Sequence, residues 1–363
     1  MRIALDGACF SPRQTGVGRY FQGLLRELLP LDPAIAYTLF LKEEADPGLD
    51  FPNLRTVPLL RPGSNALWQN LLLRPAVKRG GFDLFWSPNY SLPFRLGTPS
   101  LLTVHDVSWL ALPGEYPALN RLYRRVASGR GCRTARVVFA DSEFTRRELI
   151  ERMGLPGGKI RCIHLGIEDG FRRCGADEVE EFKARHGLAG RRIVGFLGSF
   201  FRRRHVPDLI AAMEIVRRCH PDAALMLVGE NHAVPPGRLA NDAPGLIWRE
   251  RLAEDELNAF YSSLSLFLYP SEYEGFGLPP MEALQCGTPS LLLRGSSLSE
   301  LYHDLALFVD RADPVSLAEA IGGFFRDEAG TRERLLGLWR ERRSYFSWRR
   351  AAGECLAAIR EAS

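Results

Sequence analysis

Short apolar runs alternate with amphipathic stretches along most of the chain. Each run is typical of a strand that is buried on both faces of a parallel sheet. The predicted strands lie at residues 2–6, 37–41, 54–57, 83–86, 100–104, 136–140, 160–163, 192–197, 224–228, 246–248, 264–269 and 290–293. Helices are predicted between several of them, at 21–29, after Ser142, at 206–219 and at 255–263. Strands that alternate with helices in this way predict an α/β fold.

The alternation lapses once, between residues 169 and 190, where glycine and charged residues replace the apolar pattern. We therefore predict two domains, the first at 1–170 and the second from 171 onward. A chain of 363 residues has the length for two domains of ordinary size.

The stretch 271–289 lies between two predicted strands, 264–269 and 290–293. Gly275 and Gly277 open it as a loop, and two adjacent prolines follow where a helix should begin. Gly287 stands where that helix should end. The segment is thus predicted as strand, glycine-rich loop, helix and strand. Its loop would lie at the carboxyl end of a strand, where open α/β sheets bind ligands.

Two carboxylates bracket this loop. Glu274 ends the strand side, and Glu282 is expected in the first helical turn, so both would point into one crevice. The backbone N–H groups of Gly275, Phe276 and Gly277 would donate to hydroxyls or to an anion. Such a set suits a sugar carried on a nucleotide. For either glutamate alone a structural explanation also stands, because the helix dipole favours a first-turn acid and turns often hold an acid before glycine.

The segment from Glu274 to Pro289 closely resembles the Glu-seven-residues-Glu motif of the retaining family 4 glycosyltransferases, and the resemblance covers nearly the whole chain. It implies the GT-B fold, with two Rossmann-like doubly wound parallel-sheet domains and an active site in the cleft between them. Residues 1–170 would form the N-terminal acceptor domain, completed by the C-terminal helix 347–363. Residues 171–346 would form the C-terminal nucleotide-sugar donor domain.

The resemblance also implies a set of donor-binding residues. They are Gly16, Arg203, Arg204, Leu252, Glu274, Gly275, Phe276, Gly277, Leu278 and Glu282. Glu274 would hold sugar hydroxyls, Glu282 the ribose diol, and the backbone near Leu252 the base.

The arginines follow the strand 192–197 and precede a helix. Cations at a helix start can grip a diphosphate, although they could also be solvated surface. Arg203 and Arg204 match an Arg-Lys pair of the family, with a planar arginine in place of lysine. Gly16 lies in the turn Gln14–Tyr20, whose Gly-x-Gly is a weak signal that tight strand–helix packing would also explain.

His105 follows the predicted strand 100–104. A histidine there is often structural, but it matches the sugar-facing histidine of the family. Glu274, His105 and Arg203 are the predicted catalytic residues. Asn89 and Tyr90, in the loop after strand 83–86, together with Asp106 are the predicted acceptor contacts.

The distribution of charge and of cysteines limits the partners and the metal sites that the chain could have. The net charge is +4, and residues 1–170 hold 22 basic against 16 acidic side chains. Six arginines lie within 120–136, which is either a solvated helix face or a region attracted to anionic lipid or a diphosphate-bearing acceptor. No recognition motif supports nucleic acid as a partner. Seven scattered cysteines suggest reduced thiols and argue against a zinc site.

The chain begins as a strand rather than as a signal peptide, and it has no apolar run long enough for a transmembrane helix. We therefore expect a cytoplasmic protein, peripheral at most at the inner face of the membrane.

The predicted reaction is the retaining transfer of a hexose from a nucleoside diphosphate sugar to a hydroxyl. Mannose from GDP-mannose is the first expectation and UDP- or dTDP-sugars the next. The acceptor would be a glycan or a lipid-linked glycan in surface polysaccharide synthesis. Since the sequence contains no Asp-x-Asp, we expect a metal-independent enzyme without a cofactor. A nucleotide-sugar epimerase of the same architecture, or a non-catalytic sugar-nucleotide binder, are the alternatives.

Overall fold

The computed structural model describes residues 1–363 except 12–14, 62, 236, 238, 240–244 and 363. The chain forms two compact units, each with its own sheet. The first consists of Met1–Gly166 together with Tyr345–Ser363, and the second of Ile167–Ser344. The boundary between the two units, after Gly166, thus lies a few residues before the predicted boundary at position 170.

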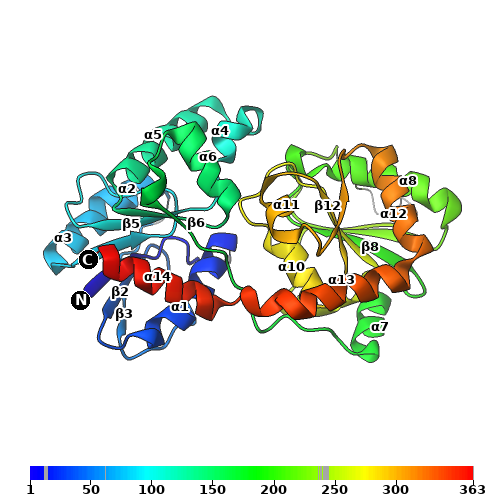
Figure 1. The fold of residues 1–363 in the computed structure, drawn as a ribbon, viewed down its shortest axis with the longest axis horizontal. Coiled ribbons are helices and arrows are strands. Elements are labelled where there is room, and N and C mark those ends of the chain that lie inside the picture. Colours follow the sequence, from blue (N-terminus) through cyan, green and yellow to red (C-terminus); the bar gives the residue numbers. More distant parts are fainter. Residues whose placement is uncertain (12–14, 62, 236, 238, 240–244, 363) are drawn as a thin grey trace. The chain divides into compact units, whose positions relative to one another are not determined.

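The first unit is built on a seven-stranded parallel sheet with the order β3-β2-β1-β4-β5-β6-β7 (Figure 1). The strands are β1 (Arg2–Asp6), β2 (Ala36–Leu41), β3 (Leu54–Pro58), β4 (Leu84–Ser87), β5 (Ser100–Val104), β6 (Val137–Ala140) and β7 (Ile160–Cys162). The helices are α1 (Gly16–Leu31), α2 (Asn65–Trp68), η1 (Gln69–Leu73), α3 (Arg74–Gly80), α4 (Ser108–Ala111), η2 (Pro113–Glu115), α5 (Ala118–Thr134), α6 (Glu143–Met153), η3 (Gly157–Lys159) and α14 (Trp348–Ala362). A short turn, η7 (Arg343–Tyr345), precedes α14.

The C-terminal helix α14 packs on α1 within the first unit. Trp348 occupies the space beside Gly23 of α1, where an added Cβ would come within 2.6 Å of the indole. An added Cβ on Gly166 would lie 2.6 Å from the same ring, so both glycines are there to admit Trp348. Chain ends far apart in sequence therefore share one core.

The second unit holds a six-stranded parallel sheet with the order β10-β9-β8-β11-β12-β13. The strands are β8 (Arg192–Leu197), β9 (Ala223–Val228), β10 (Leu246–Arg249), β11 (Leu266–Tyr269), β12 (Ser290–Leu293) and β13 (Leu307–Val309). The helices are α7 (Ala176–Arg185), η4 (Arg202–Arg204), α8 (Val206–Cys219), η6 (Glu254–Glu256), α9 (Leu257–Ser263), α10 (Leu278–Gln285), α11 (Ser296–Tyr302), α12 (Pro314–Arg326) and α13 (Glu328–Arg342).

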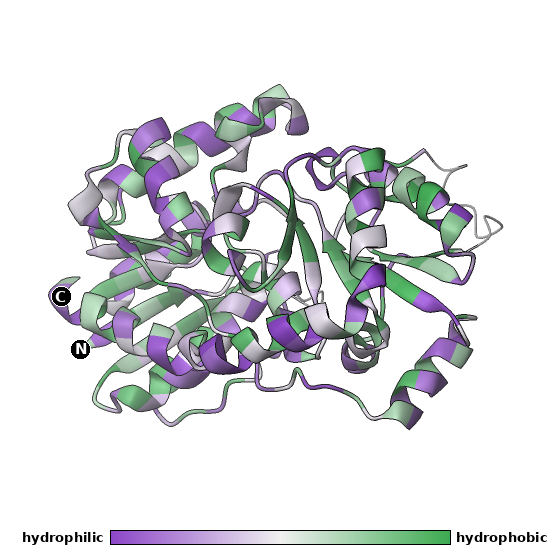
Figure 2. Cartoon of the chain, turned by 45° about the vertical axis from the view of Figure 1, so that its right-hand side comes forward, coloured by the Kyte–Doolittle hydropathy of each residue, from purple (hydrophilic) through white to green (hydrophobic). Residues whose placement is uncertain are grey.

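In each sheet the strands are added first on one side and then on the other side of the strand that comes first in the sequence, which is β1 in one sheet and β8 in the other. This is the doubly wound Rossmann order, and it confirms the predicted pair of Rossmann-like domains. The central strands β4, β5, β6, β9 and β11 are buried along their whole length, which explains why they read as unbroken apolar runs. Figure 2 shows strands in hydrophobic colours within each unit.

The stretch 169–190 is less empty of structure than its sequence suggested, because α7 lies within it. Phe182 is the one buried residue of this helix, so its apolar pattern is too weak to stand out. Among the described residues no helix has both the length and the apolar character to cross a bilayer.

Candidate functional site

The loops that follow β8 and β11 meet at the switch point of the second sheet. β11 pairs directly with β8, with Phe267 opposite Gly195. Beyond the strands the two loops are joined by their main chains, since Glu272 N–H donates to the Arg203 carbonyl at 2.9 Å. The sequence-predicted residues Arg203, Arg204 and Glu274 therefore lie in two connected loops, at the edge where doubly wound sheets bind ligands.

Glu274 is held by three donors on one of its carboxylate oxygens. Oε1 accepts from Arg204 Nε at 3.0 Å, from the Tyr269 hydroxyl at 3.0 Å and from the Ser271 hydroxyl at 2.8 Å. Among the described residues none donates a hydrogen bond to Oε2, so that oxygen keeps its capacity to accept one.

The electrostatics keep this carboxylate ionised. Burial acts to raise the pKa of Glu274, but the charges of Arg204 and Arg203 and the hydrogen bond from Ser271 outweigh burial and lower the pKa below its usual value. A fixed negative charge therefore stands at the end of β11.

The two arginines are held differently. Arg204 donates through Nε to Glu274 and through Nη1 to the Ser199 carbonyl at 3.1 Å. Arg203 places its guanidinium over the Phe201 ring, 4.8 Å from the ring centre. Both belong to η4, directly before α8, so their charges stand at the N-terminus of a fourteen-residue helix. Whether they bind a diphosphate stays a prediction.

His205 was missed by the sequence reasoning, and it fastens the same two loops together. Its Nδ1 lies 2.9 Å from Asp208 Oδ2 in α8, and its Nε2 lies 2.7 Å from Glu272 Oε1 in the β11 loop. The backbone of His205 is left-handed, with φ +51°, which is uncommon for a residue other than glycine. The sequence offered one indication of this role, because Asp208 follows His205 by three positions at the start of a predicted helix. Nothing in the sequence linked His205 to Glu272.

The glycine-rich loop is supported from α11. The Ser297 hydroxyl donates to the carbonyls of Glu274 at 2.9 Å and of Phe276 at 3.1 Å, and the Tyr302 hydroxyl donates to the Gly277 carbonyl. Gly277 caps α10 with φ +87°, and a Cβ there would lie 2.7 Å from a Leu298 methyl group. Glycine is therefore required at 277 by both conformation and space.

Glu282 does not lie where the sequence placed it. α10 begins at Leu278, so Glu282 falls in the second turn rather than the first, and that prediction was wrong. Its side chain is buried, with 5% of the residue exposed, and its Oε2 accepts from the Tyr261 hydroxyl at 2.6 Å. The helix dipole therefore does not explain this acid. Glu274 and Glu282 have separate partners, and their joint binding of one ligand stays a prediction.

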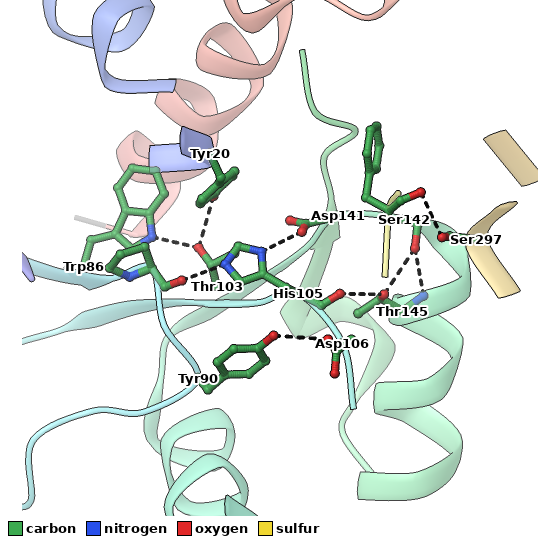
Figure 3. A network of polar contacts seen from close by, with 12 residues as sticks. Tyr20, Trp86, Tyr90, Thr103, His105, Asp106, Asp141, Ser142, Thr145 and Ser297 are labelled. Carbon is green, nitrogen blue, oxygen red and sulfur yellow. Dashed lines mark hydrogen bonds and ion pairs between the residues drawn. The ribbon is translucent and has the colours of Figure 1, made fainter. Parts of the chain in front are cut away.

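In the first unit, His105 lies just beyond β5 with both ring nitrogens engaged (Figure 3). Nε2 donates to the Pro88 carbonyl at 2.9 Å, and Nδ1 lies 2.6 Å from Asp141 Oδ2. Burial acts to lower the pKa of His105, but the Asp141 carboxylate and these hydrogen bonds outweigh it and raise the pKa. The imidazolium form satisfies both acceptors. A sugar hydroxyl could bind the ring only by replacing one of them.

Asp141 is a second residue that the sequence reasoning missed. It follows β6, which pairs with β5, so its carboxylate arises beside His105. The signal was present, because residues that follow neighbouring parallel strands emerge at one edge of the sheet.

Two of the predicted acceptor residues, Tyr90 and Asp106, lie beside His105. The Tyr90 hydroxyl donates to Asp106 Oδ2 at 3.3 Å, and the Tyr90 ring meets the His105 ring edge-on at 5.6 Å. Tyr90 has φ +57°, a strained conformation for a tyrosine. Asp106 Oδ1 accepts from the backbone and hydroxyl of Ser108 at 2.9 and 2.7 Å, which orders the turn into α4. Asn89, beside Tyr90, is partly exposed.

Gly16 and Gly18, in the first turn of α1, have different surroundings. A Cβ on Gly18 would lie 2.9 Å from the Cys9 carbonyl, so close packing explains that glycine. A Cβ on Gly16 would meet nothing within 4 Å, so packing does not explain Gly16. Thr15 caps the helix by accepting from Gly18 N–H at 3.1 Å. Gln14 lies outside the described residues.

Leu252, the predicted base contact, lies beyond β10 and is partly exposed. Its neighbour Arg251 pairs with Glu230 after β9, at 2.5 Å. In the described part of the chain, no three His, Cys, Asp or Glu side chains are grouped so as to hold a metal ion.

Two family models match the chain, one for each half. Residues 15–171 match Glycosyltransferase Family 4, and residues 178–336 match Glycosyl transferases group 1. The first matched segment lies in the first structural unit except for its last residues, 167–171, and the second lies wholly in the second unit.

Two curated relatives are named as mannosyltransferases. The O-antigen chain mannosyltransferase B of Escherichia coli is 25% identical over 288 residues, 76% of this chain and 74% of the relative. The GDP-mannose-dependent alpha-(1-6)-phosphatidylinositol monomannoside mannosyltransferase of Mycolicibacterium smegmatis is 26% identical over 236 residues, 61% of this chain and 59% of the relative.

Solved structures share the fold over the full length. Sucrose-phosphate synthase from Thermosynechococcus elongatus matches with a TM-score of 0.78 at 22% identity, covering 100% of both chains. Anabaena HepE in complex with UDP and glucose matches with a TM-score of 0.76 at 17% identity, covering 99% of both chains. These similarities confirm the predicted GT-B architecture.

Proposed function

We propose a specific reaction for this chain, which is a glycosyltransferase of the GT-B type: the retaining transfer of mannose from GDP-mannose to a hydroxyl of a glycan or lipid-linked acceptor. The observation that carries the proposal is the ionised Glu274, which is fixed against Arg204 at the sheet switch point and has one carboxylate oxygen open. A carboxylate of this kind can accept hydrogen bonds from sugar hydroxyls, with cations beside it for the diphosphate.

The choice of donor rests on the relatives. One is named as dependent on GDP-mannose and another as a mannosyltransferase of O-antigen chains, whereas a solved structure of the same fold contains UDP and glucose. GDP-mannose is therefore the first candidate, and UDP- or dTDP-hexoses come next. Surface polysaccharide synthesis is the setting that these relatives suggest.

The proposed step needs charge stabilisation and positioning. The anomeric C–O bond to the diphosphate breaks, and its electron pair goes to the phosphate oxygen. The acceptor oxygen attacks from the same face, and its proton passes to that departing oxygen. Arg203, Arg204 and the N-terminus of α8 would stabilise the growing negative charge, while Glu274 Oε2 holds the sugar hydroxyls.

The remaining roles follow from the family pattern. Glu282 is assigned to the ribose diol, the backbone near Leu252 to the base, and the amides of Gly16 and of the loop 275–277, with Leu278, to the donor. His105 is assigned to a sugar hydroxyl, with Asp106, Asn89 and Tyr90 toward the acceptor. We propose no metal and no cofactor, because arginine charge would do what a cation does elsewhere.

We also propose that the enzyme works in the cytoplasm, at the inner face of the membrane. The basic excess of residues 1–170 would attract both anionic lipid and a diphosphate-bearing acceptor. No part of the proposal requires a nucleic acid.

A panel of GDP-, UDP- and dTDP-sugars with a thermal-unfolding readout tests the donor. A ligand at about 100 times its Kd stabilises by about 2.7 kcal/mol, and for a unit of this size each kcal/mol raises Tm by roughly 2–4 °C. GDP-mannose should give the largest shift.

Transfer of labelled mannose to a lipid-linked glycan then tests the reaction. Absence of a shift with every nucleotide sugar would contradict the proposal. Conversion of the donor in the absence of any acceptor would indicate an epimerase. Binding without turnover would indicate a non-catalytic binder.

A further inference from the structure

The first half of α5 stands away from the core. From Ala118 to Ala127 no residue of this helix is buried, whereas Ser128, Gly129, Gly131 and Cys132 in its second half are. Four large apolar side chains of the first half are strongly exposed: Leu119 by 83%, Leu122 by 59%, Tyr123 by 49% and Val126 by 62%. Their spacing of three, four and seven positions puts them on one face, which we call the α5 stripe.

Two of the three arginines in the same half-helix, Arg121 and Arg124, turn toward the protein. Arg124 lies over three aromatic rings of its own unit, at 6.0 Å from Tyr90, 5.8 Å from Trp109 and 5.6 Å from Tyr116. Arg121 donates through Nη1 to the Pro113 carbonyl at 3.1 Å. A helix on a water-exposed surface normally has the opposite arrangement, with apolar residues inward. The α5 stripe therefore exposes apolar area that this unit does not cover.

The surroundings of the stripe are positively charged. From Tyr116 to Ala140 the chain contains no acidic residue. Arg125, within the stripe's span, is exposed, and Arg133 and Arg136 are exposed farther along. An apolar strip among exposed arginines is complementary to a surface that is negative outside and apolar beneath.

A further exposed apolar side chain, Phe94, lies beside Arg130 in the second half of α5. Arg130 of α5 donates to the Leu92 carbonyl at 2.8 Å and lies over the Phe94 ring at 4.8 Å. Phe94 is itself 47% exposed, and its neighbour Arg95 also stacks on it. An exposed aromatic ring flanked by two arginines repeats the composition of the stripe.

We propose that the α5 stripe docks the enzyme on an anionic lipid bilayer, with Leu119, Leu122, Tyr123 and Val126 entering the interface and the arginines meeting the headgroups. The helix, of seventeen residues, would lie in the plane of the surface. Basic charge favours this occupant over a second copy of the chain, because two such faces would repel one another. The inference extends the proposed function, since it places the enzyme where a lipid-linked acceptor would be found.

Co-sedimentation with vesicles tests it without any donor or acceptor, so that failure of the proposed reaction does not affect the result. The probes are vesicles of equal parts phosphatidylglycerol and phosphatidylcholine, and vesicles of phosphatidylcholine alone. The protein should bind the anionic vesicles, and binding should weaken as salt is raised.

Substitutions in the stripe provide the specific readout. Leu122→Asp should weaken vesicle binding by about tenfold or more, because it removes buried apolar area and adds repulsion. Val315→Asp is the matched control, since Val315 is equally exposed, by 57%, but lies on α12 of the second unit. Arg125→Glu should also weaken binding, while Arg334→Glu on α13 should not. Circular dichroism and thermal unfolding confirm that each variant is folded.

Three outcomes would overturn the proposal. The first is that the protein remains in the supernatant with anionic vesicles. The second is that Val315→Asp weakens binding as much as Leu122→Asp does. The third is a dimer in light scattering that Leu122→Asp dissociates, in which case the α5 stripe is a contact between copies of the chain.

Discussion

Arg204 Nε lies 3.0 Å from Glu274 Oε1, and this ion pair joins the loop after β8 to the loop after β11. Both side chains are largely buried, each with 13% exposed, so the pair is shielded from solvent. Part of the charge of Arg204 is therefore already balanced before any diphosphate arrives, and Glu274 is anchored through one oxygen only. The site thus contains one anchored carboxylate, Glu274, and two arginines, Arg203 and Arg204, that have different partners.

Replacement of Glu274 should lower both turnover and stability, because the buried donors Arg204, Tyr269 and Ser271 lose their acceptor. Glu274→Ala is expected to lower kcat by about 100-fold or more, because the sugar loses its positioning and its charge partner. Steady-state kinetics with GDP-mannose measures the effect, and Glu333→Gln, at an exposed position on α13, should change kcat little. Near-normal turnover in Glu274→Ala would refute the assignment.

Glu282 should contribute to both stability and donor binding. Glu282→Ala leaves the buried Tyr261 hydroxyl without this acceptor, which should cost about 1–3 kcal/mol in the free energy of unfolding. It should also raise the Kd for the donor while kcat at saturation changes less. Tyr261→Phe separates the two roles, since it keeps the carboxylate. Equal donor affinity in the wild type and Glu282→Ala, measured by calorimetry, would leave Glu282 with a structural role alone.

The His105–Asp141 pair predicts a dependence on pH. The folded pKa of His105 is raised above its ordinary value, so its stabilising contribution is complete at pH values below about 6.5 and is lost as pH rises through the raised pKa. Titration of the ring by NMR should give a pKa above about 6.5 in the wild type and a lower one in Asp141→Asn. A wild-type pKa at or below that value would contradict the pairing.

Gly16 and Gly18 form a natural pair of test positions. Gly16→Ala should fold normally and gain up to about 1 kcal/mol from helix propensity, since nothing lies near the new Cβ. Donor affinity should fall if the amide of Gly16 approaches the diphosphate. Gly18→Ala should instead lower Tm, because its Cβ would press on the Cys9 carbonyl. Unchanged donor affinity in Gly16→Ala would remove Gly16 from the binding site.

Metal independence can be tested by chelation. Turnover measured after treatment with EDTA and gel filtration should equal that of the untreated enzyme, because arginine charge is proposed to stabilise the leaving diphosphate. Loss of activity that Mg²⁺ or Mn²⁺ restores would contradict this prediction. A known metal-dependent glycosyltransferase, treated in parallel, shows that the chelation was complete.

The sequence predicted most strands to within one or two residues, because a strand buried on both faces must be apolar throughout. It also located the loop 271–289, because glycine and proline mark turns and helix starts by their own backbone restrictions. It placed Glu282 in the first turn of α10 rather than at the start of the second, since the exact first residue of α10 depends on how Gly277 packs against Leu298. It missed α7, whose side chains are mostly exposed and so carry little pattern.

Local patterns thus determined by themselves that this chain forms two parallel sheets and that ligand chemistry gathers after the strands of each. Only the tertiary structure decided which side chains meet: Arg204 with Glu274, 70 positions apart, and His105 with Asp141, 36 positions apart. It also decided that the apolar face of α5 points to solvent while Arg124 turns inward. The reason is that backbone preferences act between near neighbours, whereas pairing of charges and burial of side chains depend on strand order and packing across the whole unit.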